Sequence, residues 1–469
     1  MNENPPPIPP PLPSAPFVRA PRRRRHGTAI KLGTVAVLTL LLLIPLTLIR
    51  GVLAERLQRR DEAVRNITAT WGEQQVVAGP VLIVPYKYRF KTWKEQVVNG
   101  KVVRQEIEET ATARAHFLPA ALAVDGALQP DRLHRGIYET VVYRGQLKLS
   151  GRFARPNFDE WKVAAEDVMW EDAQVAFAIT DLRGAKDALV LQWDGQSLPL
   201  TPGARFGGFT SGVHARLKGA AFTNDSVAFD LALTLNGSRG LSFAPVGTQN
   251  EVRLTSPWPD PSFTGAFLPS ERKISGSGFE ATWQVSYYGR SYPQQWSEQE
   301  KSAPFDAAAV NASLFGVDLI SVVDSYRLVE RSTKYGLLFI VLVFTTFFLF
   351  EVLAPVRIHP FQYVLVGAAL CLFYLALLSL SEITGFGGAY AAGAAGATLM
   401  VTLYSAKMLR SFRRTAVIAG GLSAIYGFLY VILRQQDYSL LFGTAGLFLV
   451  LAVVMYTTRN IDWYARDEQ

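Results

Sequence analysis

Six long apolar runs constrain this chain more than any other feature of its sequence. A bilayer core about 30 Å thick is crossed by roughly 20 helical residues, with about 17 as the lower limit. One run is isolated near the N-terminus and five lie close together at the C-terminus: 32–49, 335–350, 361–380, 390–404, 416–433 and 438–457. The run at 390–404 is short, but residues 386–389 can extend it. With 49 % hydrophobic residues in 469, the chain is predicted to be a membrane protein with six transmembrane helices.

The N-terminal segment predicts an uncleaved signal anchor behind a disordered tail. Residues 1–21 (MNENPPPIPPPLPSAPFVRAP) favour an extended, solvated polyproline conformation and, only weakly, a ligand for an aromatic-lined groove. Four arginines at 22–25 then precede an apolar run that ends without a small-residue cleavage site. We therefore expect a disordered cytoplasmic tail over 1–28 and a transmembrane anchor over 29–50.

Charge in the short loops predicts the orientation, because cytoplasmic loops retain Lys and Arg. With the N-terminus inside, the inner side collects most of these cations: residues 22–25, Arg357, Lys407, Arg410, Arg413, Arg414, Arg459 and Arg466. The opposite loops, 381–389 and 434–437, hold only Arg434. Five arginines between positions 50 and 65 oppose this assignment, but they begin a long segment, and long segments translocate largely regardless of charge. The prediction is a periplasmic domain over 51–333, a five-helix bundle over 334–458 and a cytoplasmic tail over 459–469.

Charged residues at the ends of the spans are expected to mark the membrane boundaries. In RSTKYGLLFIVLVFTTFFLFE (331–351), Arg331 and Lys334 can reach outer headgroups, and Glu351 marks the cytoplasmic exit. Glu351 either pairs with Arg357 or His359 or is simply solvated at the helix end. Glu382 and Asp437 are expected at outer ends.

The segment between the first two spans has the short alternating pattern of β-strands. Asn99-Gly100 and Asp194-Gly195 are hairpin turn signals between β-prone flanks. Two helices are expected, a stalk over 52–71 and a second over 158–170. The fold class is therefore an α+β membrane protein with a large, mainly antiparallel β domain, a sandwich or rolled sheet. The single cysteine, Cys371, lies in a span, so the domain is held without a disulfide.

The stretch SPWPDPSFTGAFLP (256–269) has prolines that cannot donate ladder hydrogen bonds, so a rigid loop is expected rather than a central strand. Its aromatic residues Trp258, Phe263 and Phe267 either cap the core of the sheet or present a contact surface for a partner or lipid.

Catalytic and metal-binding patterns are not evident in the sequence. No G-x-S-x-G, H-E-x-x-H, P-loop or G-x-G-x-x-G pattern occurs, and His116, His134 and His214 are scattered singly. An acidic patch, Glu166, Asp167, Glu171 and Asp172, is better explained as a solvated face than as a cation site. No catalytic, cofactor or metal residues are expected, and the protein is predicted not to be an enzyme.

Within the spans, small residues are the main pattern, since no ionisable group lies near a span centre as a transport pathway usually requires. Gly388, Ala392 and Gly396, and then Gly420, Ala424 and Gly427, recur at three- or four-residue spacing. They predict close approach of helix backbones in a packed bundle.

Several long segments together resemble the CreD family, inner-membrane cell envelope integrity proteins of Gram-negative bacteria. They are WGEQQVVAGPVLIVPY, RGIYETVVYRGQLKLSGRF, LSFAPVGTQNEVRLTSPWPDPSFTGAFLP, DSYRLVERSTKYGLLFI, IHPFQYVLVGAALCLFYLALLSLSE and VMYTTRNIDWY, in order between about residues 60 and 464. The resemblance implies a signal anchor, a periplasmic domain, a C-terminal bundle and an envelope-stress role in a two-component regulon, with altered tolerance to toxins and β-lactams. It implies no catalytic residues, and the proline-rich N-terminus departs from it.

The main hypothesis is a non-enzymatic protein of the bacterial inner membrane that maintains the envelope by binding or scaffolding through its periplasmic domain. Its expected partners are the lipid bilayer and a periplasmic or envelope protein, and not nucleic acid. The alternatives are a transporter or lipid-handling protein with a periplasmic substrate domain, an envelope enzyme, and a sensor that signals to the Arg-rich cytoplasmic side. A polar path or lateral groove through the bundle favours the first, and clustered titratable residues in one pocket favour the second.

Overall fold

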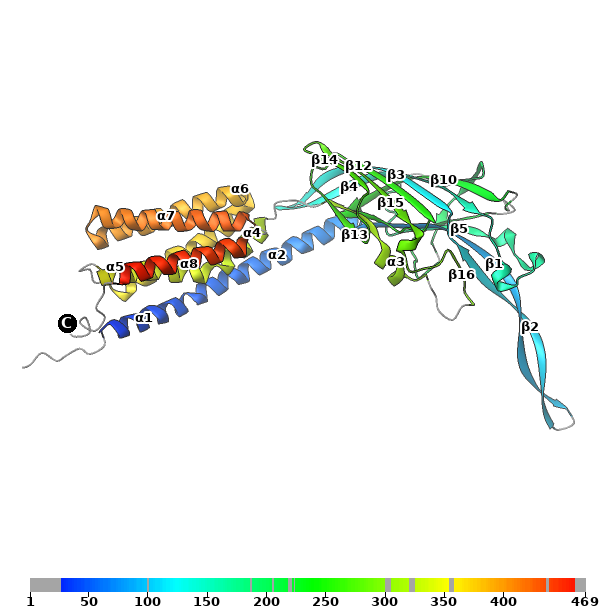
Figure 1. Ribbon diagram of the computed structural model, residues 1–469, viewed down its shortest axis with the longest axis horizontal. Helices are drawn as coiled ribbons and strands as arrows, with labels where there is room; N and C mark the ends of the chain where they lie inside the picture. The colour runs from blue at the N-terminus through cyan, green and yellow to red at the C-terminus, as the bar shows by residue number, and fades with distance from the viewer. Residues whose placement is uncertain are drawn as a thin grey trace, which may run out of the picture. The chain divides into compact units, whose positions relative to one another are not determined.

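The chain divides into a helical unit, Met1–Glu55 with Ser325–Gln469, and a β-rich unit, Arg56–Asp324 (Figure 1). A computed structural model describes residues 27–98, 101–185, 188–204, 206–217, 222, 224–299, 305–319, 325–353, 358–435 and 438–459. The predicted disordered tail, 1–28, and the predicted cytoplasmic tail, 459–469, lie outside the described residues except for positions 27, 28 and 459. Each unit is described separately.

The β-rich unit contains two sheets. The nine-stranded sheet has the order β13 (Pro261–Gly265), β17 (Phe315–Leu319), β11 (Gly240–Phe243), β1 (Gln75–Val98), β5 (Gln174–Ile179), β9 (Gly212–Arg216) and β8 (Thr201–Pro202), with β2 (Lys101–Phe117) paired to β1 and β16 (Gln295–Ser297) to β2. The eight-stranded sheet has the order β14 (Glu271–Ser275), β15 (Gly278–Ser286), β12 (Gln249–Ser256), β3 (Ala121–Arg135), β4 (Tyr138–Ala154), β10 (Ser226–Ser238), β6 (Val190–Trp193) and β7 (Gln196–Pro199). A short helix, α3 (Ala307–Ser313), begins at Asp306, whose side chain accepts a hydrogen bond from the Ala309 N–H.

The strand directions differ in part from the sequence prediction. Most pairs are antiparallel as expected, but β1 pairs with β11 in parallel, and β12 pairs with β3 in parallel. Both parallel pairs join strands far apart in the chain, as parallel neighbours require a long connection. The sheets are therefore mixed rather than purely antiparallel.

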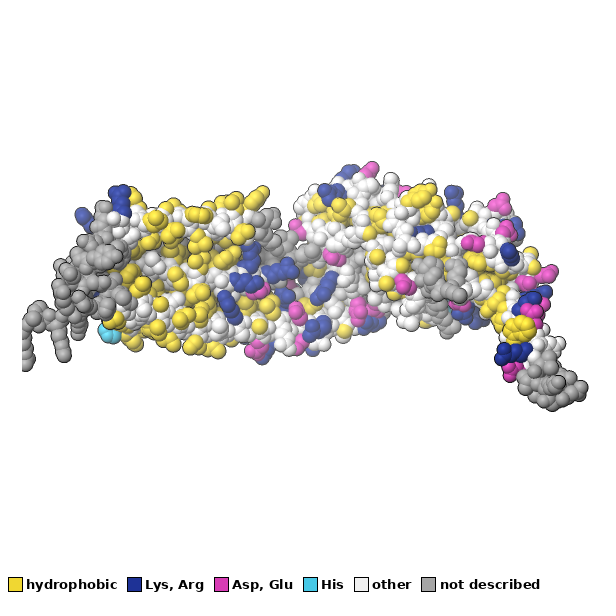
Figure 2. Space-filling model, turned by 60° about the horizontal axis from the view of Figure 1, so that its bottom comes forward, with side chains coloured by type: hydrophobic (Ala, Val, Ile, Leu, Met, Phe, Trp, Pro, Cys, Tyr) yellow, Lys and Arg dark blue, Asp and Glu magenta, His cyan; other side chains and the backbone are white. Residues whose placement is uncertain are grey.

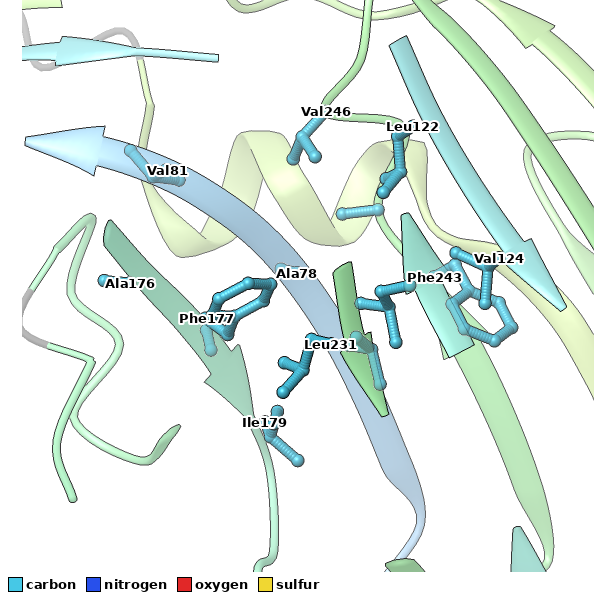
Figure 3. Close-up of a cluster of buried hydrophobic side chains, with 14 of the residues drawn as sticks. Ala78, Val81, Leu122, Val124, Ala176, Phe177, Ile179, Leu231, Phe243 and Val246 are labelled. Atoms are coloured by element: carbon cyan, nitrogen blue, oxygen red, sulfur yellow. The ribbon is translucent and has the colours of Figure 1, made fainter. Parts of the chain in front are cut away.

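The core of the β-rich unit is formed by side chains from both sheets. Along β10 buried and more exposed residues alternate, with Val227, Phe229, Leu231 and their successors buried, as a half-buried strand requires. Figure 3 shows Leu231 near Phe177 of β5 and Ala78 of β1, all in one continuous apolar cluster. Burial of each large apolar side chain contributes about 1.5–3 kcal/mol, which holds the unit together without a disulfide.

Both predicted hairpins are present. Asp194 and Gly195 have positive φ angles of 48° and 78° and connect the antiparallel strands β6 and β7, as a type I′ turn requires. The first hairpin is confirmed by the pairing of Val98 with Lys101, although its turn residues, 99–100, lie outside the described residues.

The helix predicted over 158–170 is wrong. Three short 3-10 turns occupy this region instead: η1 (Asp159–Trp161), η2 (Ala165–Asp167) and η3 (Trp170–Asp172); a fourth, η4, spans Tyr287–Gly289. Lys162 has a left-handed backbone that ends η1. Phe158 and Trp161 turn inward to meet the ring of Phe117 at centroid distances of 5.3 and 5.8 Å, so aromatic packing overrides the local preference for a helix.

The proline-rich stretch 256–269 is predicted to be a rigid loop. The structure differs, because residues 261–265 form the strand β13. This strand is at the end of the nine-stranded sheet, where it pairs only with β17 in the described sheet order. An edge position is where a strand can begin with a proline, since the missing N–H then leaves no ladder bond unmade.

The helical unit contains α1 (Gly27–Leu41), the first part of α2 (Leu43–Trp71), α4 (Ser325–Lys334), α5 (Gly336–Leu353), α6 (Pro360–Leu409), α7 (Phe412–Arg434) and α8 (Ser439–Thr458). The stalk helix predicted over 52–71 is confirmed as the C-terminal part of α2. Four described helices, with α1 and α2 taken together, are long and apolar enough to cross a membrane, and α4 with α5, bent by 47°, makes up to five. Figure 2 shows hydrophobic side chains spread over the visible surface of this unit.

Helix α6 is a helical hairpin. The rings of Phe373 and Tyr390 are 5.4 Å apart, whereas a straight helix would separate these positions by about 25 Å. The reversal lies at Gly385, which has non-helical angles of φ 70° and ψ 171°. The second arm, 386–409, includes the extension that the short apolar run was expected to have.

The predicted small-residue contacts are mostly absent from this bundle. A Cβ placed on Gly396, Gly420 or Gly427 would meet no described atom within 4 Å, so these positions do not bring backbones together. Gly393, which was not among the predicted residues, lies at a close contact between the two arms of α6. A Cβ on Gly393 would lie 3.2 Å from the ring of Phe373.

Candidate binding surface

The hairpin of β1 and β2 extends from the β-rich unit as a two-stranded ribbon (Figure 1). Pairing runs from Leu82 with Phe117 to Val98 with Lys101. In the described chain, β5 pairs with β1 only as far as Ile83, and β16 pairs with β2 only over 115–117. Beyond these points, apart from one bridge between Tyr86 and Val168, both outer edges of the ribbon have no described strand partner.

One face of the ribbon carries a row of aromatic rings that leads outward from the core. Tyr86 is fully buried, Tyr88 follows at a centroid distance of 6.4 Å, and Phe90 at a further 5.9 Å. Phe90 is 39 % exposed. The row therefore ends in an apolar side chain that water can reach.

The opposite face carries an exposed tryptophan among ion pairs. Trp93 is 64 % exposed and lies in register with Glu106. Glu106 pairs with Lys91 at 3.3 Å, and Arg104 pairs with Glu95 at 2.9 Å. Figure 2 shows hydrophobic side chains interspersed with charged ones along the ribbon. Exposed ion pairs stabilise little, so these charges chiefly keep the ribbon soluble around its aromatic residues.

The root of the ribbon is fixed to the core. His116 of β2 stacks on Trp296 of β16 with centroids 4.9 Å apart and planes 3° apart. Burial, and secondarily the charge of Arg114, lower the pKa of His116 to about 4, so this imidazole is neutral at pH 7. The Tyr86 hydroxyl and Ser297 Oγ are 2.6 Å apart. A rigid root and an open, unpaired outer part suit contact with another molecule by strand addition and aromatic anchoring.

Sequence reasoning found the turn of this hairpin but missed the length of its strands and the exposure of Trp93. The alternation of aromatic residues at positions 86, 88 and 90 was the available signal. Exposure of a tryptophan on a ribbon depends on which strands pair with it, and no local pattern reveals that.

The aromatic residues of the 256–269 stretch pack inward. Trp258 is 8 % exposed, its Nε1 donates to the Asp260 carbonyl at 3.1 Å, and the Arg132 guanidinium lies 5.5 Å from its ring centroid. Phe263 meets the ring of Trp283 edge-on at 5.6 Å. This placement favours the capping interpretation for these side chains.

Phe267 is also partly buried against the core. Its ring meets that of Phe315 edge-on at 5.9 Å, and its carbonyl accepts a hydrogen bond from Trp283 Nε1 at 3.2 Å.

The basic residues before the second apolar run lie on α4. Arg331 Nη2 donates to the carbonyls of Ile432 and Gln435 at 3.5 and 3.3 Å, at the end of α7. Lys334 pairs with Glu330 at 2.9 Å within the same helix.

Glu351 has a partner that the sequence did not indicate. Its carboxylate lies 2.7 Å from Lys31 Nζ of α1 and accepts further hydrogen bonds from the Ile358 N–H and the Tyr363 hydroxyl. Of the predicted partners, His359 instead caps α6 through Nδ1, and Arg357 lies outside the described residues. The interpretation as a simply solvated acid is wrong, since the Glu351 side chain is only 8 % exposed.

Glu382 lies in the first arm of α6 and accepts a hydrogen bond from the Tyr326 hydroxyl of α4 at 3.0 Å. The structure thus joins α4 to both α6 and α7 through polar contacts. Asp437 is outside the described residues.

The titratable residues of the β-rich unit do not assemble into a metal site: the described residues contain no group of three or more potential ligands. His134 faces Glu139 at 3.2 Å, and His214 contacts Thr201 and the Gly203 carbonyl. The acidic residues of 166–172 lie on η2 and η3.

A buried polar cluster at the start of β1 was also missed. Gln75 Nε2 donates to the carbonyls of Asp181 and Asn236, and Asp181 pairs with Arg183 at 2.8 Å. Burial raises the pKa of Asp181. Hydrogen bonds from Arg183 and from the Glu73 N–H together lower this pKa by a larger amount, so that it lies below its usual value. The cluster joins three segments and has a structural role.

Two comparisons with known proteins agree with each other. The family described as "Inner membrane protein CreD" has a sequence model that matches residues 27–464. The Inner membrane protein CreD of Escherichia coli (strain K12) is 33 % identical over 426 residues, which cover 91 % of this chain and 91 % of that protein.

Proposed function

Because this chain belongs to the CreD family of inner membrane proteins, we propose that it maintains envelope integrity during stress by binding, not by catalysis. In this proposal the β-rich unit is periplasmic, and its β1–β2 ribbon contacts a partner in the envelope. The unit is anchored in the bilayer by the apolar helices that precede and follow it in the sequence.

The proposed topology has six crossings and cytoplasmic termini. The 50-residue α6 would be about 75 Å long if straight, more than twice a bilayer core, and its reversal at Gly385 makes it two crossings. With α1–α2, α4–α5, α7 and α8 the count is six. The distribution of Lys and Arg in the short loops supports the orientation.

The observation that carries the proposal is the ribbon itself. An isolated two-stranded hairpin is marginally stable in water, yet this one extends beyond the sheet with Phe90 and Trp93 exposed. Unpaired edges and exposed aromatic residues favour aggregation and are usually covered or blunted. A partner that adds a strand or receives the tryptophan explains why they are present here.

The test is complementation of a strain that lacks its own CreD protein. We expect a variant with Phe90→Ala and Trp93→Ala to reach normal levels in the membrane but to give at least a severalfold loss of survival under detergent or β-lactam stress. The matched control is Tyr288→Ala, which removes an aromatic residue that is 83 % exposed elsewhere on the same unit. Wild-type protection by the ribbon variant would contradict the proposal.

A further inference from the structure

A groove of about 820 Å³ lies between the second arm of α6 and α7 in the helical unit. Small residues such as Gly387, Ala391 and Gly427 line it together with the rings of Tyr390, Tyr426 and Tyr430. Of the small residues that were expected to bring helices together, Gly427 lines this open space instead.

The last helix does not occupy this groove. Gly446 of α8 packs against Phe428, where a Cβ would lie 2.5 Å from the ring. Phe428 lies about 160° around α7 from Tyr426 and Tyr430, which line the groove. Helix α8 therefore contacts another face of α7.

Two residues of the lining have buried hydroxyl groups without a partner among the described residues. Tyr426 is 3 % exposed, and its hydroxyl has no hydrogen-bond partner among the described residues. Thr402, also in the lining, has a buried Oγ1 in the same condition. By contrast the Tyr390 hydroxyl donates to the Tyr426 carbonyl at 2.7 Å. The Tyr426 and Thr402 hydroxyls are both shielded from the groove, whose lining of small and aromatic side chains suits an occupant with a large apolar part.

One end of the groove is positively charged. The exposed Arg434 lies over the ring of Tyr430, 5.3 Å from its centroid. Arg331 reaches the same end of α7 through its hydrogen bonds to Ile432 and Gln435. Guanidinium groups bind phosphate through two parallel hydrogen bonds, and aromatic residues near a span end lie at headgroup level.

We propose that this groove is a binding site for one anionic phospholipid. An acyl chain lies along the small residues and the tyrosine rings, and the phosphate lies against Arg434. In a bilayer an unfilled groove forfeits dispersion contacts, and acyl chains are the molecules at hand to fill it. A second copy of the chain could pack its helix there, but it would leave the charge of Arg434 without a phosphate.

The test uses the full chain in nanodiscs containing photoactivatable phosphatidylglycerol. Gly427→Leu fills the groove without displacing any described atom near the Cβ, and we expect about a tenfold loss of crosslinking to residues 387–430, because the leucine removes on the order of ten chain contacts. Gly420→Leu is the matched control: it lies on the same helix, also has open space, and does not line the groove. It should crosslink as the wild type does.

The headgroup is tested separately. Arg434→Gln should reduce the preference for phosphatidylglycerol over phosphatidylcholine and leave the total crosslinking nearly unchanged. Equal crosslinking by the Gly427→Leu and Gly420→Leu variants would overturn the proposal. So would crosslinks between two protein copies that the Gly427→Leu change abolishes, because the occupant would then be another helix.

Discussion

Lys31 of α1 and Glu351 of α5 form a 2.7 Å ion pair between residues that lie 320 positions apart in the sequence. We predict that Glu351→Gln lowers the apparent Tm in mild detergent more than Lys31→Gln does. Glu351 is largely buried and also accepts from Ile358 and Tyr363, whereas Lys31 is half exposed and can turn to water. Removing the acid leaves more groups unpaired.

The double variant separates this pair from its surroundings. When Lys31 and Glu351 are changed together, the change in the free energy of unfolding should differ by about 1–2 kcal/mol from the sum of the two single changes. The effects of substitutions at two residues in direct contact are not additive. Strictly additive Tm shifts would show that the ion pair contributes nothing.

Trp258 and Trp93 form a natural comparison of a capping and an exposed tryptophan. Trp258→Ala should lower the free energy of unfolding of the β-rich unit by about 3–5 kcal/mol, because it leaves a cavity at the core. Trp93→Ala should change it by no more than about 0.5 kcal/mol. Urea unfolding of the full chain in detergent, followed by tryptophan fluorescence, measures both. If Trp258→Ala unfolds like the wild type yet loses envelope protection, Trp258 is a contact residue instead.

The stability of the β-rich unit should decrease as the pH is lowered, because of His116. Its folded pKa is about 4 and its unfolded pKa about 6.5, so the unfolded chain binds more protons between these values. The contribution is complete above pH 6.5 and up to about 3 kcal/mol is lost as pH falls toward 4. His116→Phe keeps a ring against Trp296 and removes this titration, so its unfolding midpoint should depend less on pH.

The control for His116 is His134→Phe, which changes an exposed histidine on β3. It should retain the pH dependence of the wild type. Identical pH profiles for the wild type and His116→Phe would show that His116 is not responsible.

Local chemistry made part of this fold predictable. Asp194-Gly195 specifies its turn because both residues can adopt positive φ, and the apolar runs indicate helices because lipid leaves the backbone no other partner. The helix expected over 158–170 is replaced by 3-10 turns, because the rings of Phe158 and Trp161 pack against the ring of Phe117, and the local sequence does not reveal this contact.

The candidate site was less predictable, since it depends on contacts between distant segments. The Lys31–Glu351 pair and the parallel pairing of β1 with β11 join parts of the chain that no local window contains. The exposure of Trp93 follows from where β5 and β16 stop pairing. The residues singled out from sequence at 258–267 were those whose rings the fold buries or half buries.

The sidedness of the ribbon tests the account most directly, because binding in the envelope requires a periplasmic β-rich unit. The measurement is labelling of a Trp93→Cys variant, with Cys371 replaced by alanine, by a membrane-impermeant maleimide. The account predicts labelling in spheroplasts and protection in inverted vesicles, with the reverse for a cysteine at Ser411 before α7. Labelling of position 93 only in inverted vesicles would contradict the account.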